Sequence, residues 1–158
     1  MPQPTTDTHR RDLLRFMRLH RLAVEASRAP DGGVQAALVG IAVTDAFELV
    51  FDTLGSTRKA QNLRNSPRAA FVLGGCSAND ERTVQFEGVA DEPVGAELER
   101  VQSTYFEAWP DGPVRASWPG ITYFRVRPTW IRFSDFGCAP PRILEFTADQ
   151  LAECAPNE

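Results

Sequence analysis

The sequence has few of the residues that bind metal ions or form disulfides. It holds three cysteines, Cys76, Cys138 and Cys154, and two histidines, His9 and His20, among 158 residues. The cysteines lie far apart, and the sequence contains neither a Cys-x-x-Cys pair nor a Cys/His ligand spacing. Scattered cysteines in odd number argue against a disulfide framework, and a structural zinc site needs four ligands close together. We therefore predict no metal site and a reduced, cytoplasmic compartment.

Long apolar runs and an excess of basic residues are also missing. No run of about 18 apolar residues occurs, so the sequence predicts no membrane span. The polar start of the chain lacks the apolar core of a secretory signal. The formal net charge is −4, which argues against nucleic-acid binding because phosphate backbones attract basic surfaces. A local group of cations on such an acidic protein suits a small anionic ligand better.

Apolar residues are plentiful enough for one globular domain. Hydrophobic residues make up 42% of the chain and charged residues 24%, which is typical of a folded core rather than of disorder. A chain of this length is expected to form a single domain. We place this domain at residues 12–146, between a flexible N-terminal tail (1–11) and a C-terminal tail (147–158).

Short apolar segments separated by turn residues predict a mainly β fold. Parallel strands need crossovers of a dozen or more residues, and only one predicted helix clearly offers such a crossover, so an antiparallel barrel with helices outside it is favoured. The second and third strands should form a hairpin, and Gly88 marks an expected bulge. We expect strands at residues 22–27, 34–44, 48–51, 68–73, 83–91 and 121–133, and helices at 12–20, 57–64 and 96–109.

The most informative segment joins a predicted strand to a short predicted helix. Ser56, Thr57, Arg58 and Lys59 stand where that helix begins. The first turn of a helix has backbone N–H groups without partners, and its dipole favours an anion there. Two cations are poorly placed at this position unless an anion joins them. The segment predicts a bound phosphate; the alternative is a solvated turn with an N-capping hydroxyl.

Several segments in this order resemble the pyridoxamine 5′-phosphate oxidase-like family, the FMN-binding split barrels. They read LVFDT, STRKAQNL, NSPRAAFV, ERTVQFEGVA and FRVRPTWIRF, and the resemblance covers about residues 12–135. It implies a six-stranded antiparallel split β-barrel with peripheral helices. It also implies a homodimer that binds FMN in a groove at the subunit interface.

The resemblance further implies which residues bind the flavin. Thr57, Arg58 and Lys59 would grip the FMN phosphate, with Ser56 as an alternate hydroxyl. A guanidinium fork and a point-charge ammonium both suit a phosphate dianion. The residues expected to line the ring system are Val39, Gly40, Ile41, Phe51, Asp52 and Thr53 through backbone groups, and Thr83 or Gln85 through a polar side chain. For Gln85 the alternative is an outward-facing strand residue.

The C-terminal part departs from the oxidases that act on pyridoxamine phosphate. Those enzymes carry an Arg-Leu-His-Asp-Arg run there, whereas this chain reads RILEF from Arg142. The histidine is replaced by Leu144, and the second arginine is also missing. We therefore do not predict oxidation of pyridoxamine phosphate itself, and we interpret Arg142 as a surface residue.

These observations predict an FMN flavoprotein that acts as an oxidoreductase on an unidentified substrate. The carboxylate pairs Asp80/Glu81 and Asp91/Glu92 are interpreted as solvated loop residues, so no catalytic side chain is assigned. The alternative is a non-catalytic protein that binds flavin, the deazaflavin F420 or haem on the same fold. His20 is the candidate haem ligand, although a histidine at the end of a helix is also favoured electrostatically.

Overall fold

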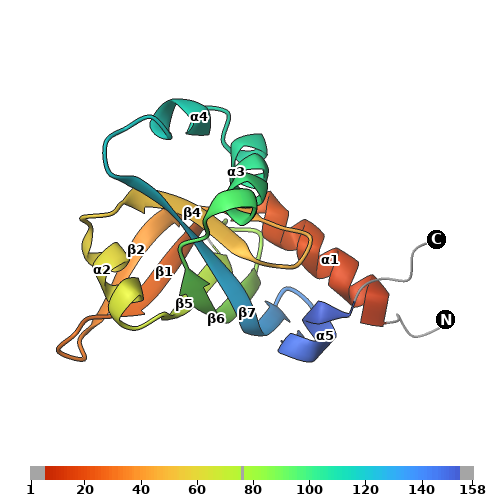
Figure 1. The fold of residues 1–158 in the computed structure, drawn as a ribbon. Coiled ribbons are helices and arrows are strands. Elements are labelled where there is room, and N and C mark those ends of the chain that lie inside the picture. The colour runs from red at the N-terminus through yellow and green to blue at the C-terminus, as the bar shows by residue number, and fades with distance from the viewer. Residues whose placement is uncertain (1–5, 76, 154–158) are drawn as a thin grey trace.

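The computed structural model describes residues 6–75 and 77–153, and a curled antiparallel sheet with helices around it forms the fold (Figure 1). The strands are β1 (Leu22–Arg28), β2 (Val34–Gly40), β3 (Ala42–Val43), β4 (Leu49–Leu54), β5 (Arg68–Gly74), β6 (Arg82–Asp91), β7 (Ile121–Asp135) and β8 (Arg142–Thr147). The helices are α1 (Thr6–Leu19), α2 (Arg58–Asn65), α3 (Gly95–Ala108), α4 (Gly112–Arg115) and α5 (Ala148–Ala152). The predicted class, mainly β and antiparallel, is confirmed.

The order of the strands explains why the barrel is split. The described strands pair in the order β2-β1-β5-β6-β7-β4-β3, with β8 added to β7, and each pairing is antiparallel. The two ends of this path, β2 and β3, are separated in the chain by Ile41 alone. β3 pairs with β4 only as far as Val50, and beyond it β4 pairs only with β7 in the described sheet. The facing edges of β2 and β4 therefore carry backbone groups without strand partners.

Two local features raise the strand number above the six predicted. The segment predicted as one strand over 34–44 breaks at Ile41, whose N–H donates to the Arg21 carbonyl at 2.8 Å. Residues 142–147, which the sequence does not assign to a strand, pair with residues 130–135 of β7. The hairpin between β3 and β4 is present, and the expected bulge is confirmed by a register shift between Glu87 and Gly88.

Helices α1 and α5 occupy segments that the sequence assigns partly to tails. α1 begins at Thr6 rather than near Asp12, with Asp7 in its first turn, where a carboxylate complements the helix dipole. α5 begins after Thr147, which forms a capping box with Gln150, and it buries Leu151. Residues 1–5 and 154–158 of the two expected tails lie outside the described residues.

Aromatic side chains fill the inside of the sheet. The core contains Phe51, Phe71, Phe86 and Phe124, each at most 2% exposed, with ring centroids of successive neighbours 5.6–6.1 Å apart. Rings at these separations gain from offset or edge contacts beyond the burial of their area. Helix α2 lies at the opposite end of the curled sheet from α1 and α5 (Figure 1), and the buried residues of all three helices join the same core. The start of α2 is therefore remote from the α1 end of the molecule.

Candidate functional site

Helix α2 begins at the predicted place, directly after β4. Thr57 is its N-cap: the backbone of Thr57 is extended, and its hydroxyl accepts a hydrogen bond from the Ala60 N–H at 3.4 Å. The hydroxyls of Thr53 and Thr57 lie 3.1 Å apart and bond to each other. This bond ties the end of β4 to the first turn of α2, so the candidate phosphate site has a fixed backbone.

The two cations of this turn form no ion pair in the described part of the chain, although the charge of Lys59 acts on the buried Glu25 carboxyl. No carboxylate there lies within 4.0 Å of the Arg58 or Lys59 side-chain nitrogens. Arg58 is exposed and its guanidinium lies beside the Gln35 side-chain amide of β2, while Lys59 is half-buried. At the other end of the helix, Arg64 pairs with Glu92 at 2.6 Å. Unpaired cations at a helix start leave room for an anion, which also satisfies the helix dipole.

A polar cluster beneath α2, which the sequence analysis did not identify, supports this turn. Asn62 is 3% exposed; its Nδ2 donates to Ser27 Oγ at 3.2 Å and lies 2.8 Å from the Gln35 side-chain amide. A buried amide without such partners would destabilise the fold. The cluster joins α2 to β1 and β2. Its members lie 27 and 35 residues apart in sequence, so spacing alone could not reveal it.

The residues predicted to line a flavin ring fall on the two open edges of the split. Val39, Gly40 and Ile41 lie at the end of β2, and residues 51–53 lie on the part of β4 that pairs only with β7. Phe51 is fully buried and stacks on Phe124, with ring centroids 5.6 Å apart. It can therefore offer only backbone groups. At Gly40, an added Cβ would meet the Trp109 indole at 2.8 Å, so this position accepts no larger side chain without movement of the ring.

The side chain of Asp52 is already bound within the protomer. It accepts hydrogen bonds from the Tyr105 hydroxyl at 2.9 Å and from Arg115 Nε at 3.0 Å, and Arg115 also donates to the Tyr105 hydroxyl at 3.1 Å. Burial, and then the neighbouring Asp52 carboxylate, raise the pKa of Tyr105. This triad fixes α3 and α4 over β4. Only the backbone of Asp52 is therefore available to a ligand, as the prediction assumed.

Thr83 and Gln85 lie on β6, where Thr83 pairs with Ser134 of β7. Gln85 is exposed and lies opposite Val72 of β5. The next residue, Phe86, is 1% exposed and faces the core, so Gln85 lies on the outer face of the sheet. Its side chain therefore points away from the interior of its own barrel and is accessible to a second molecule on that face.

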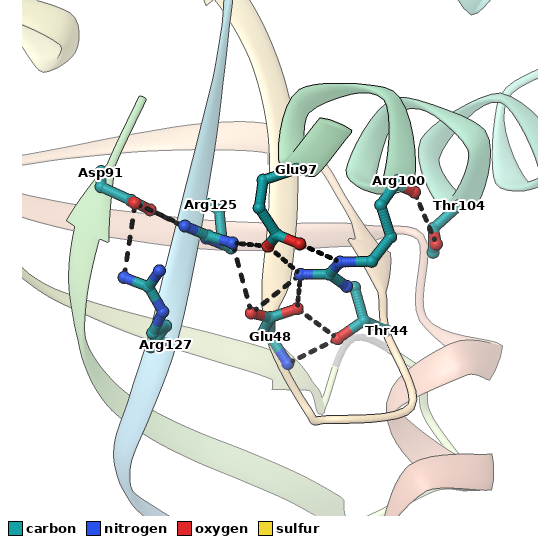
Figure 2. Close-up of polar contacts among 8 residues, drawn as sticks. All are labelled: Thr44, Glu48, Asp91, Glu97, Arg100, Thr104, Arg125 and Arg127. Carbon is teal, nitrogen blue, oxygen red and sulfur yellow. Dashed lines mark hydrogen bonds and ion pairs between the residues drawn. The ribbon is translucent and has the colours of Figure 1, made fainter. Parts of the chain in front are cut away.

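A second group of charged residues lies at the start of α3 and surrounds Arg125 (Figure 2). Arg125 is 4% exposed and donates to Asp91 at 2.6 Å and to Glu97. Arg100 joins Glu97 and Glu48, each at 2.9 Å, and Glu48 accepts from the Thr44 hydroxyl at 2.9 Å. With Arg127, which lies 3.3 Å from Asp91, three arginines face three carboxylates. We call these six charged residues the Arg125 network.

The Arg125 network is arranged for stability rather than for chemistry. Hydrogen bonds from Arg125 lower the pKa of Asp91, and those from Arg100 lower the pKa of Glu97, so both carboxylates stay ionised. Neither is poised to exchange a proton near neutral pH. The interpretation of Asp91, Glu92 and Asp80 as solvated loop residues was incomplete, because each is ion-paired: Asp91 with Arg125, Glu92 with Arg64 and Asp80 with Arg82.

A partly open hollow lies between α1 and the β7–β8 pair, away from α2. It has a volume of about 220 Å³ and contains none of the predicted flavin residues. Apolar side chains of Phe16 and Phe133 and the charged groups of Arg15 and Arg142 line it. Arg142 is thus exposed, as predicted, but borders a cavity.

The described residues contain neither a candidate metal site nor a membrane-spanning helix. No group of three or more His, Cys, Asp or Glu side chains there could hold a metal ion. None of the helices in residues 6–75 and 77–153 has the length and apolar character needed to cross a bilayer. Of the three cysteines, Cys138 is exposed and free, while Cys76 and Cys154 lie outside the described residues.

Solved structures with the same fold bind different cofactors. The chain superposes on a haem-binding protein from Mycobacterium smegmatis with TM-score 0.81 and 17% identity, covering 96% of this chain and 62% of that one. It superposes on a pyridoxamine 5′-phosphate oxidase-related, FMN-binding protein from Nostoc punctiforme with TM-score 0.64 and 13% identity, covering 93% and 91%. The haem storage protein HutZ from Vibrio cholerae gives TM-score 0.65 and 13% identity over 75% and 88%. At these identities the likeness establishes the fold.

Comparison of sequences places the chain more closely. A search of curated proteins finds no match. The profile of the pyridoxamine 5′-phosphate oxidase family matches residues 10–135, a range that includes β1 to β7 and the whole α2 turn. The fold, the α2 turn and this match agree, and the chain belongs to the pyridoxamine 5′-phosphate oxidase family.

Proposed function

We propose that this protein binds FMN, with the phosphate at the start of α2, and that it acts as an oxidoreductase on a substrate still to be identified. The observation that supports this most is the pair of unpaired cations, Arg58 and Lys59, on a capped helix start. FMN, when bound, supplies hydride or single-electron chemistry, while the protein supplies position and electrostatics. The FMN-binding protein of Nostoc punctiforme has the same fold, which adds support.

The residues present suit the phosphate group of FMN. Ser56 is exposed, Arg58 can offer a two-pronged guanidinium contact, and Lys59 adds a second positive charge. The Thr57 hydroxyl is engaged with Ala60 and Thr53, so its role is to hold the turn in shape. The open backbone edges of β2 and β4 would face the ring.

We further propose a homodimer built on the outer face of β1, β2 and β5. Four apolar side chains share this face: Leu22, Val24, Leu38 and Val72 are 53%, 42%, 66% and 46% exposed. Val24 lies opposite Leu38 on one side and Val72 on the other, so the four form one continuous patch. Patches of this kind mark interaction sites. Because Val72 is the cross-strand partner of Gln85, a twofold contact here could bring Gln85 to the partner's flavin.

Sedimentation and flavin titration together test the dimer. Leu38→Glu should convert a dimer to a monomer and weaken FMN binding, because it places a charge in the centre of the apolar patch. Val114→Glu is the matched control, since Val114 is 67% exposed on α4 and lies off the patch. A wild-type protein that sediments as a monomer while it holds FMN would exclude the shared site.

The absorbance spectrum of the purified protein, before and after addition of FMN and desalting, tests the cofactor. The two-banded spectrum of oxidised flavin that survives desalting supports the proposal. The single long-wavelength band of a deazaflavin would instead identify F420 as the cofactor. Bleaching by a reduced nicotinamide and rapid reoxidation would distinguish an enzyme from a flavin carrier. A protein that retains no flavin at micromolar concentration would overturn the proposal.

Haem binding is the second candidate function, favoured by one side chain and two similar structures. His20 Nε2 is buried and has no hydrogen-bond partner among the described residues, and the His20 ring lies 4.5 Å from that of Phe16. Two structures of this fold are a haem-binding and a haem storage protein. An intense Soret band that is lost in His20→Ala would favour this function over flavin binding.

A further inference from the structure

A carboxyl group is buried on β1, the strand that the Asn62–Ser27 hydrogen bond ties to α2. Glu25 lies on β1 with its side chain on the inner face of the sheet, and it is 1% exposed. Its cross-strand neighbours are Ala37 of β2 and Phe71 of β5, neither of which carries a charge. A buried carboxylate is costly unless it is paired and hydrogen-bonded. The presence of Glu25 at this place therefore needs an explanation.

The hydrogen bonding of Glu25 is incomplete. Its Oε1 is buried and has no hydrogen-bond partner among the described residues. Burial raises the pKa of Glu25, while the Ser27 hydroxyl and the charge of Lys59 act in the opposite direction. Lys59 lies in the first turn of α2, one helical turn before Asn62, and Asn62 bonds to Ser27, two residues along β1 from Glu25. The cation that acts on Glu25 is thus also a predicted phosphate ligand.

Among the described neighbours of Glu25 on α2, β2 and β5, no other charged group takes this role. From α2, Asn62 is neutral and is bonded to Ser27, and Arg58 lies beside the Gln35 amide of β2. The neighbours on β2 and β5 are apolar. Glu25 and Lys59 are thus an electrostatically linked pair, one member on β1 and the other within the turn.

We infer that Glu25 sets the net charge of the phosphate site, so that a phosphate dianion binds there more tightly when Glu25 is protonated. The inference rests on the proposed function. With Glu25 ionised, its charge offsets that of Lys59 and leaves the turn with one net positive charge beside Arg58. With Glu25 neutral, both cations act on the ligand, which matches the roughly two negative charges of a phosphomonoester at neutral pH.

Linkage then requires the reverse effect. If protonation of Glu25 strengthens phosphate binding, phosphate binding must raise the proton affinity of Glu25 by the same factor. FMN binding should therefore be accompanied by proton uptake at pH values above the free-state pKa of Glu25. A ligand without a phosphate, such as riboflavin, should bind without this uptake.

The test is a series of FMN titrations of the full chain from about pH 5 to 8. Glu25→Gln should bind FMN about tenfold more tightly than wild type at the upper end, the order expected for one unit charge in a protein dielectric. The ratio of the two dissociation constants should approach one as the pH falls. The titration of the phosphate itself affects both proteins equally and cancels in this ratio.

Two controls separate a local effect from a change in net charge. Glu99→Gln removes the same charge from an exposed position on α3 and should leave FMN affinity unchanged. Riboflavin titrations should show no difference between wild type and Glu25→Gln. Calorimetry of wild type and of Glu25→Gln with FMN, in buffers of different ionisation enthalpy, measures proton uptake, and the difference between the two proteins is the uptake by Glu25 because the phosphate contributes to both.

The outcomes are distinguishable. A pH-dependent FMN ratio together with proton uptake by Glu25 supports the inference. Equal FMN dissociation constants for wild type and Glu25→Gln at every pH, with no proton uptake by Glu25, overturn it and leave the flavin proposal standing. Failure of wild type to bind FMN at all overturns the proposed function, and the inference falls with it.

Discussion

Two groups of cations in this molecule differ in one respect: whether a carboxylate meets them. In the Arg125 network the arginines face Asp91, Glu97 and Glu48 (Figure 2). At the start of α2 no carboxylate of the described residues lies within ion-pair distance of Arg58 or Lys59. Paired charges hold elements together, whereas unpaired ones at a fixed helix start are free to hold an anion. Pairing, rather than the number of cations, separates the candidate site from the structural network.

Removal of the unpaired cations should give the largest effect on ligand binding. Arg58→Ala together with Lys59→Ala should weaken FMN binding by about 3–6 kcal/mol, because charged hydrogen bonds contribute about 1.5–3 kcal/mol each. The free energy of unfolding of the same variant should fall by less than the binding free energy, since neither cation is ion-paired in the described structure and only Lys59 acts on a buried carboxyl group, that of Glu25. Flavin fluorescence titration and urea unfolding measure the two quantities.

A matched variant on α1 controls for the lost charge. Arg11→Ala with Arg15→Ala removes two exposed cations from α1, at the other end of the sheet. This variant should leave FMN affinity unchanged. Equal FMN affinity in wild type and in the α2 variant would mean that the phosphate does not bind at this turn.

Removal of the central cation of the Arg125 network should lower stability and leave FMN affinity unchanged. Arg125→Met should destabilise the fold by about 3–5 kcal/mol, the cost of leaving buried partners of an ion pair without their counter-charge. FMN affinity of the folded fraction should be retained, because Arg125 lies outside the turn. Urea unfolding measures the loss.

Arg127 offers the matched control at the rim of the same network. Its side chain is 54% exposed and lies 3.3 Å from Asp91, so Arg127→Met should cost less than about 1 kcal/mol. Similar losses in both variants would show that burial of Arg125 does not determine the strength of the network.

The sequence predicted the turn well because its signals are local. Thr57, Arg58 and Lys59 stand next to one another, and an N-cap needs only the residues that follow it. The antiparallel class likewise follows from short connections between apolar segments, and Gly88 marked a bulge that the structure contains. For these features, neighbours in sequence are also neighbours in space.

The sequence could not predict contacts between distant segments. Asp52 was expected to line a flavin through its backbone, and the partners of its side chain, Tyr105 and Arg115, lie 53 and 63 residues away. Nothing in the segment around Glu25 indicated that its side chain would be buried or that the charge of Lys59 would act on it. β8 was missed because its polar and apolar residues become a strand only through pairing with β7. The pairing of charges, which separates the two cation groups, is known only from the folded chain.

The smallest expected effect is a difference in the sign of pH dependence between the two regions. Hydrogen bonds from Arg125 lower the pKa of Asp91, so its contribution to stability is present above its unfolded pKa of about 3.9 and is lost as the pH falls through the lower folded value. Burial raises the pKa of Glu25, so its contribution is present at low pH and is lost as the pH rises through the folded value. In urea unfolding from about pH 3 to 7, wild type should be more stable than Asp91→Asn at neutral pH, and the two midpoints should converge at the acid end. Over the same range Glu25→Gln should be more stable than wild type only at the upper end. A constant offset of either variant across the series would contradict the assigned role of that carboxyl group.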